Sequence, residues 1–395
     1  MECSVGSALI TDLCVQERAA LLEDVALTSL QGMFTAVPDP RSCQGRRYPL
    51  SFLLTCLVAA LLGNCNGLDA VGQWCREHRE VLEAVFGPRR HLTPTGALYR
   101  WLLPQLNAAA VEAVVGTWVQ ATLHAPSDEP LVADGKAVRG AATAEEPAPH
   151  LLSVSTMHSQ ETLLQVRVDE KTNEIPVLQA VLPLLPVAGR VVLADALHTQ
   201  VVTAQGIVQL QGHYVLTVKK NQPALYDALT LFFAQPTAPL AQARTLDYAR
   251  GRREERVLRT SPELNLSLSD RWPALAQVGQ LTRTVTTKES TTHEVVYLIT
   301  SLAPTAAPPD HLLDLVRAYW RIENKRHWVR DVTFAEDRSR LRTGAAPQIM
   351  ACLRNLAITL LHRAGHTAIA AARRHFAAHP AYAFALLIAP LPLTR

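Results

Sequence analysis

The sequence predicts a chain of the α/β class that begins with an all-helical region, and three observations carry this prediction. Apolar residues recur at helical spacing from Leu27 to about Ala125. Beyond Pro130, short strand-like runs alternate with helical segments, and between about Ala241 and Ser301 helical periodicity gives way to a β-rich pattern. The 395 residues, 48% of them hydrophobic, are enough for a sizeable core and for two or three domains.

The helical region contains one long apolar run and one basic loop. The run from Pro49 to Gly63 is shorter than the roughly 20 apolar residues that span a bilayer, so we expect a buried helix and no membrane segment. Before it, DPRSCQGRRYPL places Arg46 and Arg47 in a turn-rich segment. These arginines could contact phosphates, although an ordinary solvated loop is an equally good interpretation.

The remaining elements follow in order along the chain. We expect strands at LVAD, HLLSVSTMH, TLLQVRV, RVVLAD and YVLTVK, and helices at IPVLQAVLPLL, TQVVTAQGIVQL and PALYDALTLFF. Further strands are expected at RTLDYA, REERVLRT, LNLSLS, QLTRTVTT and EVVYLIT. Helices return after Pro308 and lead to an Ala/Pro-rich tail.

Composition and motifs exclude several classes of protein. The net charge of +3 does not by itself demand a nucleic-acid partner. The seven cysteines form no CxxC pair, which indicates a reduced, cytoplasmic protein without a cysteine zinc site. The sequence has no Walker loop, GxGxxG, GxSxG or HExxH, so nucleotide-binding, serine-hydrolase and zinc-protease interpretations have no support.

Two aspartates are the first candidates for chemistry. Asp134 follows the apolar residues of LVAD, and Asp195 ends the apolar run RVVLAD. Polar groups at the carboxyl ends of parallel strands stand where ligands bind, and a pair of carboxylates there suits Mg²⁺. The alternative for each aspartate alone is a turn residue or a helix cap, and the recurrence of the same pattern lowers the weight of that alternative.

A third carboxylate lies on a basic helical stretch, YWRIENKRHWVRD. Tyr319, Glu323, His327 and Arg330 or Asp331 share one face of this helix by the i, i+4 rule, and Arg321 lies close by. Arginines that hold phosphates beside a carboxylate that holds a metal would fit a polyanionic substrate. A surface helix with many salt bridges is the alternative.

Two more segments could contact an anion. VKKNQPAL groups donors at a strand end before a helix, through Lys219, Lys220, Asn221 and Gln222, although such a segment is also an ordinary helix start. In the β-rich segment, ARGRREERVLRT carries Arg250, Arg252, Arg253, Arg256 and Arg259. Strand alternation could point several of them to one phosphate-contacting face, with Glu254 and Glu255 partly neutralising them, and an ordinary solvated strand is an equally good interpretation.

Several short blocks in fixed order resemble one family. DGKAVRG, KTNEIP, LADALHTQ, YVLTVKKNQPALY, GRREER, YLITSL and YWRIENKRHWVRDVTFAEDRSRLR resemble the insertion-sequence DDE transposases of the H-repeat-associated group, and DPRSCQGRRYPL resembles their N-terminal domain. The resemblance implies an RNase H-like core in which Asp134, Asp195 and Glu323 bind two Mg²⁺ ions, for which Mn²⁺ can substitute. Lys136 and Arg139 then become candidates for steadying the phosphate.

The same resemblance implies partners and boundaries. The expected activity is cleavage of transposon ends and their joining to target DNA, by a homodimer on double-stranded DNA in the bacterial cytoplasm or nucleoid. We expect an extension at 1–28, a DNA-binding helical domain at 29–125, a catalytic domain at 126–372 with an insertion at about 241–301, and a tail at 373–395.

Two other functions stay open from the sequence. The wider superfamily surrounds its glutamate with Tyr, Arg and Lys, where this chain has Val316, Tyr319 and Arg330. A DNA-binding protein that has lost catalysis is therefore one alternative, and a Mg²⁺-dependent nuclease without strand transfer is another.

Overall fold

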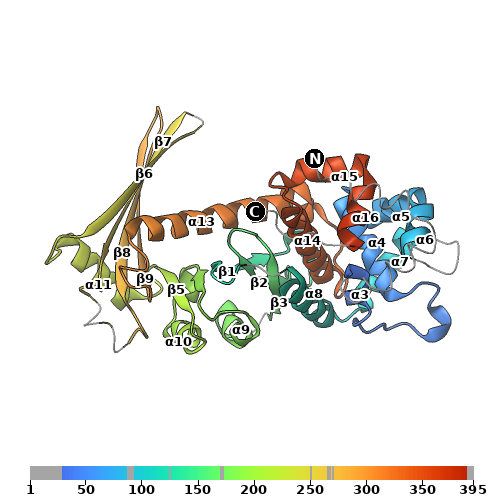
Figure 1. Ribbon diagram of the computed structural model, residues 1–395, viewed down its shortest axis with the longest axis horizontal. Helices are drawn as coiled ribbons and strands as arrows, with labels where there is room; N and C mark the ends of the chain where they lie inside the picture. The colour runs from blue at the N-terminus through green and yellow to red at the C-terminus, as the bar shows by residue number, and fades with distance from the viewer. Residues whose placement is uncertain are drawn as a thin grey trace. The chain divides into compact units, whose positions relative to one another are not determined.

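The computed structural model describes residues 29–86, 93–123, 126–169, 173–249, 251–264, 268 and 271–388 (Figure 1). The expected extension at 1–28 lies outside these residues. The chain divides into two compact units. The first unit comprises the described residues within Met1–Ala125, Gly135–Val168 and Lys325–Arg395, and the second comprises those within Pro126–Asp134 and Asp169–Asn324.

The N-terminal part of the first unit is built from helices around one apolar helix. Every residue of α4 (Leu50–Leu62) is buried, which explains its uninterrupted apolar sequence. Side-chain caps fix two helix starts, since Ser29 accepts a hydrogen bond from the Gly32 N–H and Thr95 accepts one from the Leu98 N–H. The other elements are α3 (Leu30–Phe34), η1 (Cys43–Gly45), α5 (Leu68–Glu77), α6 (Arg79–Phe86), α7 (Gly96–Leu102), η2 (Leu103–Gln105) and α8 (Ala108–Leu123).

Helix α14 (Ala346–Arg363) forms the centre of the first unit, where it packs against α4, α8 and β3. Two of its buried polar side chains form hydrogen bonds with neighbouring elements: the Gln348 side chain donates to Glu112 at 2.8 Å, and Asn355 donates to Gln165 at 2.8 Å. Much of the segment expected to be a tail is helical, in α15 (Ile369–Ala378) and α16 (Pro380–Ile388). Helix α16 packs on α3 and α4, because its apolar face supplies buried residues to the core.

Strands β2 (His150–Thr156) and β3 (Thr162–Val168) form an antiparallel pair in the first unit, and β2 is hydrogen-bonded to β1 (Leu131–Ala137), which is followed by the short η3 (Arg139–Ala141). Helix α13 (Pro309–Trp328) continues as a π-helical turn, η6 (Val329–Thr333). The chain then passes through Ala335 in a left-handed conformation, φ 52°, into η7 (Glu336–Arg338).

The second unit alternates strands and helices before a long antiparallel ribbon. Strands β1, β4 (Val191–Ala194) and β5 (His213–Val218) are parallel neighbours. The helical elements around them are α9 (Glu174–Val181), η4 (Leu182–Leu184), η5 (Ala196–His198), α10 (Val201–Gln209) and α11 (Pro223–Ala234). These strands and helices were predicted correctly, because each apolar run is short and ends at turn residues.

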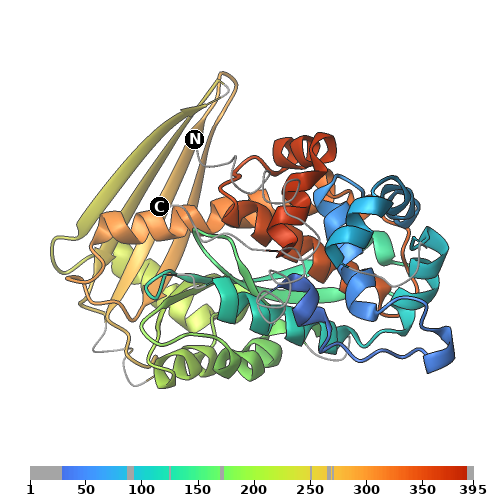
Figure 2. The ribbon, with the colours of Figure 1, turned by 45° about the vertical axis from the view of Figure 1, so that its right-hand side comes forward.

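The ribbon consists of β6 (Ala241–Ala249), β7 (Arg252–Ser261), β8 (Gln277–Thr286) and β9 (Thr291–Thr300), drawn in yellow to orange in Figure 2. Strand β9 pairs antiparallel with β5, so the hydrogen-bonded order is β1-β4-β5-β9-β8-β7-β6. The four strands confirm four of the five strands predicted in this segment. The fifth, LNLSLS, lies mostly outside the described residues, and its first residue, Leu264, is in a turn. Among the helices that the structure describes, none is long and apolar enough to cross a membrane.

Candidate active site

Asp134 and Asp195 lie beside each other on neighbouring parallel strands. In the register of β1 and β4, Ala133 is opposite Ala194, and each aspartate is the next residue along its chain. Neighbouring strands are about 5 Å apart. The second unit therefore presents two carboxylates from adjacent backbones at one end of its parallel strands, as the sequence predicted.

One detail of that prediction was wrong, because Asp134 does not end its strand. Strand β1 continues to Ala137, while its register with β4 stops at Ala133. The backbone remains paired on the side of β2, where the Val138 N–H donates to the carbonyl oxygen of Pro149 at 2.9 Å. Asp134 thus follows the last parallel pair rather than the last strand residue.

The turn after β4 fixes Asp195. Its backbone is extended, with φ −70° and ψ 177°, and its Oδ1 accepts a hydrogen bond from the Leu197 N–H at 3.0 Å. The pKa of the Asp195 carboxyl is raised above its usual value of 3.8, mainly because surrounding protein removes part of its hydration. The charge of His198 acts in the opposite direction, and the Glu174 carboxylate adds to the increase.

A histidine–glutamate pair supports the same turn. His198 is buried, and its Nε2 lies 2.9 Å from Oε2 of Glu174, the first residue of α9. This contact ties the start of α9 to η5, the turn that carries Asp195. The sequence analysis assigns neither residue a role, although Glu174 falls within the block KTNEIP and His198 within LADALHTQ.

Asn221 and Gln222, predicted to contact DNA, bind the protein itself. The Asn221 amide donates to the carbonyl oxygen of Ala196. The Gln222 amide donates to the carbonyl oxygen of Thr199 at 2.9 Å and to the Gln200 side chain at 3.0 Å. These bonds run from the end of β5 to the turn after β4, so both residues brace the loop that follows Asp195.

The side chains of Lys219 and Lys220, unlike those of Asn221 and Gln222, are exposed to solvent without a described polar partner. Both follow β5 directly, and both are exposed. Because β5 is the parallel neighbour of β4, the two lysines emerge at the same end of the strands as the aspartates. Their ammonium groups are therefore available to an anion in solution.

Glu323 lies in α13, and its side chain lies outside the described residues. The described side chains alone contain no group of three or more His, Cys, Asp or Glu that could hold a metal ion. The two aspartates nevertheless form a suitable hard-oxygen donor set for Mg²⁺, which typically takes one or two carboxylates and completes its shell with water and phosphate.

Lys136 and Arg330, two residues predicted to contact phosphate, instead form ion pairs with carboxylates of the first unit. Lys136 is buried, and its Nζ lies 2.7 Å from Oδ1 of Asp331. Arg330 is 2% exposed, and its Nη2 lies 2.8 Å from Oε1 of Glu336, which also pairs with Arg354 at 3.2 Å. In these positions both cations are engaged by carboxylates within the first unit.

The arginines of β7 are also paired. Arg252 lies 2.9 Å from Glu254, Arg253 lies 3.3 Å from Glu255, and Arg256 lies 2.7 Å from Asp247. Burial alone would raise the pKa of Glu254, but the hydrogen bond from Arg283 and the surrounding arginine charges outweigh it and lower that pKa. The neutralisation is more complete than expected, because Asp247 also pairs with Arg256.

The remaining predicted contacts differ in exposure. Tyr319 is buried, Arg321 is exposed and His327 is partly exposed. Arg46 is exposed and donates to the carbonyl oxygens of Arg41 at 2.9 Å and of Asp39 at 3.2 Å. Arg47 and Arg139 are exposed, so these two could reach a ligand without breaking a described contact.

Two protein-family models match this chain. Residues 127–360, more than half of the chain, match the family described as Transposase DDE domain, and residues 32–119 match the family described as DDE_Tnp_1-associated. The chain belongs to the transposase DDE domain family. Its relatives confirm the resemblance to the H-repeat-associated group.

Relatives of this DDE family member cover most of its length. It is 25% identical to "Putative transposase YncI" of Escherichia coli O157:H7 over 85% of this chain and 88% of that protein. It is 26% identical to "H repeat-associated putative transposase YhhI" of Escherichia coli K12 over 85% and 90%. The solved synaptic complex of piggyBac transposase with hairpin DNA overlaps 93% of this chain and 80% of that one, at 11% identity and a TM-score of 0.41.

Proposed function

We propose that this DDE family member is a metal-dependent DNA transposase that cleaves transposon ends and joins them to target DNA. The observation that carries the proposal is the placement of Asp134 and Asp195 on adjacent parallel strands. The parallel order β1-β4-β5 within the second unit further supports an RNase H-like core. The proposed boundaries remain 29–125 for the DNA-binding domain and 126–372 for the catalytic domain.

Asp134, Asp195 and Glu323 would hold the metal, and members of this family generally use divalent ions. When bound, two Mg²⁺ ions, or Mn²⁺ in their place, supply Lewis-acid stabilisation to the attacking and leaving oxygens of a phosphodiester. The raised pKa of Asp195 is consistent with a carboxylate whose ionised form needs a nearby cation.

The surrounding residues position the carboxylates and the DNA. The Leu197 N–H, the His198–Glu174 pair and the Asn221 and Gln222 amides fix the turn that carries Asp195. Lys219 and Lys220, exposed at the same strand ends, would bind the phosphates that flank the cleaved bond. Because two transposon ends must be cut and joined, we propose that the active form is a homodimer on double-stranded DNA.

The test uses the DNA that flanks the gene, in which the inverted repeats define the transposon ends. A labelled end duplex incubated with the protein and Mg²⁺ or Mn²⁺ should yield cleaved and then joined products. Asp134→Asn should reduce both below detection, whereas Asp227→Asn, an exposed carboxylate in α11, should match the wild type. Full activity of Asp134→Asn would overturn the proposal.

The same assay separates the alternatives. Cleavage without joined products would identify a nuclease, and salt-sensitive binding without metal-dependent cleavage would identify a DNA-binding protein that has lost catalysis. Val316 and Tyr319, which replace the Tyr and Arg of the wider superfamily, give that last alternative its basis.

A further inference from the structure

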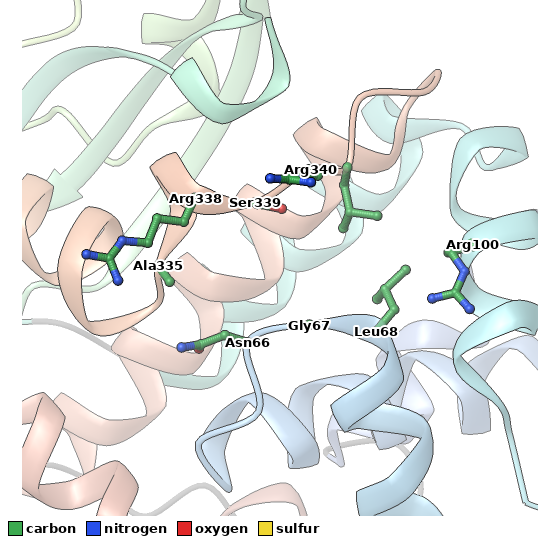
Figure 3. A pocket seen from close by; sticks show the side chains of 9 residues that line it. Asn66, Gly67, Leu68, Arg100, Ala335, Arg338, Ser339 and Arg340 are labelled. Carbon is green, nitrogen blue, oxygen red and sulfur yellow. The ribbon is translucent and has the colours of Figure 1, made fainter.

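The first unit contains a basic pocket of about 350 Å³ that the proposed function does not use. Asn66, Gly67 and Leu68 lie along one side, and Arg100, Arg338 and Arg340 contribute three guanidinium groups. Figure 3 shows Arg338 and Arg100 on opposite sides of the opening in this view, with Gly67 and Leu68 below it. The lining residues include three cations and no carboxylate.

Two of the arginines have no acidic partner in the part of the chain that the structure describes. Arg338 and Arg340 are both exposed, and neither forms a described ion pair. Arg100 lies 2.8 Å from Asp69, but this pair is open to solvent, with 48% and 82% of the two side chains exposed. The pocket therefore keeps most of its positive charge.

Buried contacts hold the backbone of the loop that carries Arg338 and Arg340. Glu336 is fully buried between Arg330 and Arg354, and burial tends to raise its pKa while the two guanidinium charges lower it overall. Gly140 lies against the same loop, since a Cβ at that position would come within 2.6 Å of the Ser339 carbonyl oxygen and 2.7 Å of that of Glu336. The two exposed arginines thus stand on a fixed backbone.

Asn66 links the pocket to a buried cation whose hydrogen bonds end on neutral oxygens. Arg373 donates to the carbonyl oxygens of Leu61 at 2.8 Å and Thr333 at 2.6 Å, and to Oδ1 of Asn66 at 2.8 Å. Burial lowers its pKa to about 9, so it remains charged at neutral pH. Because Asn66 lines the pocket, an anion bound there would offset this uncompensated charge.

The start of α5 adds donors to the same wall. Gly67 is the N-cap of this ten-residue helix and provides no side-chain cap, so the first backbone N–H groups and the positive end of the helix dipole are available to an anion. The lining contains no aromatic residue on which a base could stack. These features favour a phosphate group over a whole nucleotide.

We propose that this pocket binds a backbone phosphate of double-stranded DNA, through Arg338, Arg340 and Arg100. The inference rests on the proposed function only in taking DNA as the partner. A contact of this kind positions the duplex without reading its sequence, so it should act equally on a transposon end and on unrelated DNA.

The test is fluorescence anisotropy of labelled duplexes, one carrying a transposon end and one of unrelated sequence, in buffer with EDTA across a range of salt concentrations. In the double variant Arg338→Ala/Arg340→Ala, the slope of the logarithm of the DNA association constant against the logarithm of the salt concentration should become shallower by about 1 to 2. The affinity should fall by the same factor for both duplexes. Arg374→Ala, which removes an exposed arginine of α15 outside the pocket, is the matched control and should change little.

Three results would overturn the inference: an unchanged salt slope in the double variant, a loss confined to the transposon-end duplex, or absence of DNA binding by the wild type. Circular dichroism melting checks that the double variant is folded, and Arg338→Lys/Arg340→Lys should recover part of the binding. Because the assay contains no divalent metal, it can fail while the cleavage assay succeeds, and the reverse also holds.

Discussion

The ribbon of the second unit and the loop at 338–340 of the first unit are both rich in arginine, but their charges are available to very different degrees. On β7, Arg252, Arg253 and Arg256 all lie within ion-pair distance of Glu254, Glu255 or Asp247. In the loop, Arg338 and Arg340 have no described acidic partner. The density of arginines in the sequence therefore does not identify a DNA contact, because neighbouring carboxylates determine which charges remain available.

Glu336 comes two residues before this loop, and its carboxylate pairs with other arginines. Glu336 is buried and is shared between Arg330 and Arg354, so it cannot neutralise the arginines that follow it. On the ribbon, Glu254 is 6% exposed and is contacted by partly solvated arginines. Removing each carboxylate should therefore have different consequences.

The largest effect is expected from Glu336→Gln. Loss of this charge leaves two buried guanidinium groups unpaired, which should lower the free energy of unfolding by about 3 to 5 kcal/mol. Because the folded pKa of Glu336 is below its usual 4.5, the stabilisation is present above pH 4.5 and is lost as the pH falls through the folded value. Urea unfolding should thus show a difference between wild type and variant that shrinks below about pH 4.5.

The control for this variant is Asp337→Asn. The pKa of Asp337 is raised, first by burial and then by Asp331, so removing its charge should not destabilise the fold. Equal losses in the two variants would show that the loop responds to any change of charge, and the assignment of Glu336 as its anchor would be wrong.

A smaller effect is expected from Glu254→Gln on the ribbon. The carboxylate is shared by Arg252, Arg256 and Arg283, but these cations keep some contact with water, so the loss of stability should be about 1 to 2 kcal/mol. The same change releases positive charge, and non-specific DNA binding should become stronger and more sensitive to salt. Anisotropy and thermal melting of the same preparation measure both.

Weaker DNA binding by Glu254→Gln would contradict the claim that the ribbon's arginines are unavailable to DNA. It would mean that the ribbon contacts DNA with its ion pairs intact. Glu263→Gln, which removes a carboxylate near the ribbon that accepts from Thr237 at 2.7 Å, is the control for a general loss of negative charge.

The sequence predicted the strands and the aspartate pair because both depend on local patterns. The run RVVLAD ends at Asp195 for the same reason that a buried strand must end at a polar turn, and parallel pairing then places Asp134 beside it. The pairing of Lys136 with Asp331 could not be predicted, since the two residues are 195 positions apart. The basic pocket joins residues 66–68 to residues 338–340 in the same way, and only the fold of the first unit reveals it.

The smallest effect is expected from Asp69→Asn, which removes the carboxylate that pairs with Arg100 of the pocket. Its ion pair with Arg100 is exposed, so the free energy of unfolding should fall by less than about 1 kcal/mol, part of it from the lost interaction with the start of α5. DNA binding should strengthen, because Arg100 is then free to bind phosphate.

In the Arg338→Ala/Arg340→Ala background, the gain in DNA affinity from Asp69→Asn should be smaller, since the phosphate that Arg100 would share with the loop is bound more weakly. A gain of the same size in both backgrounds would mean that Arg100 acts independently of the loop, and the three arginines would not form one site.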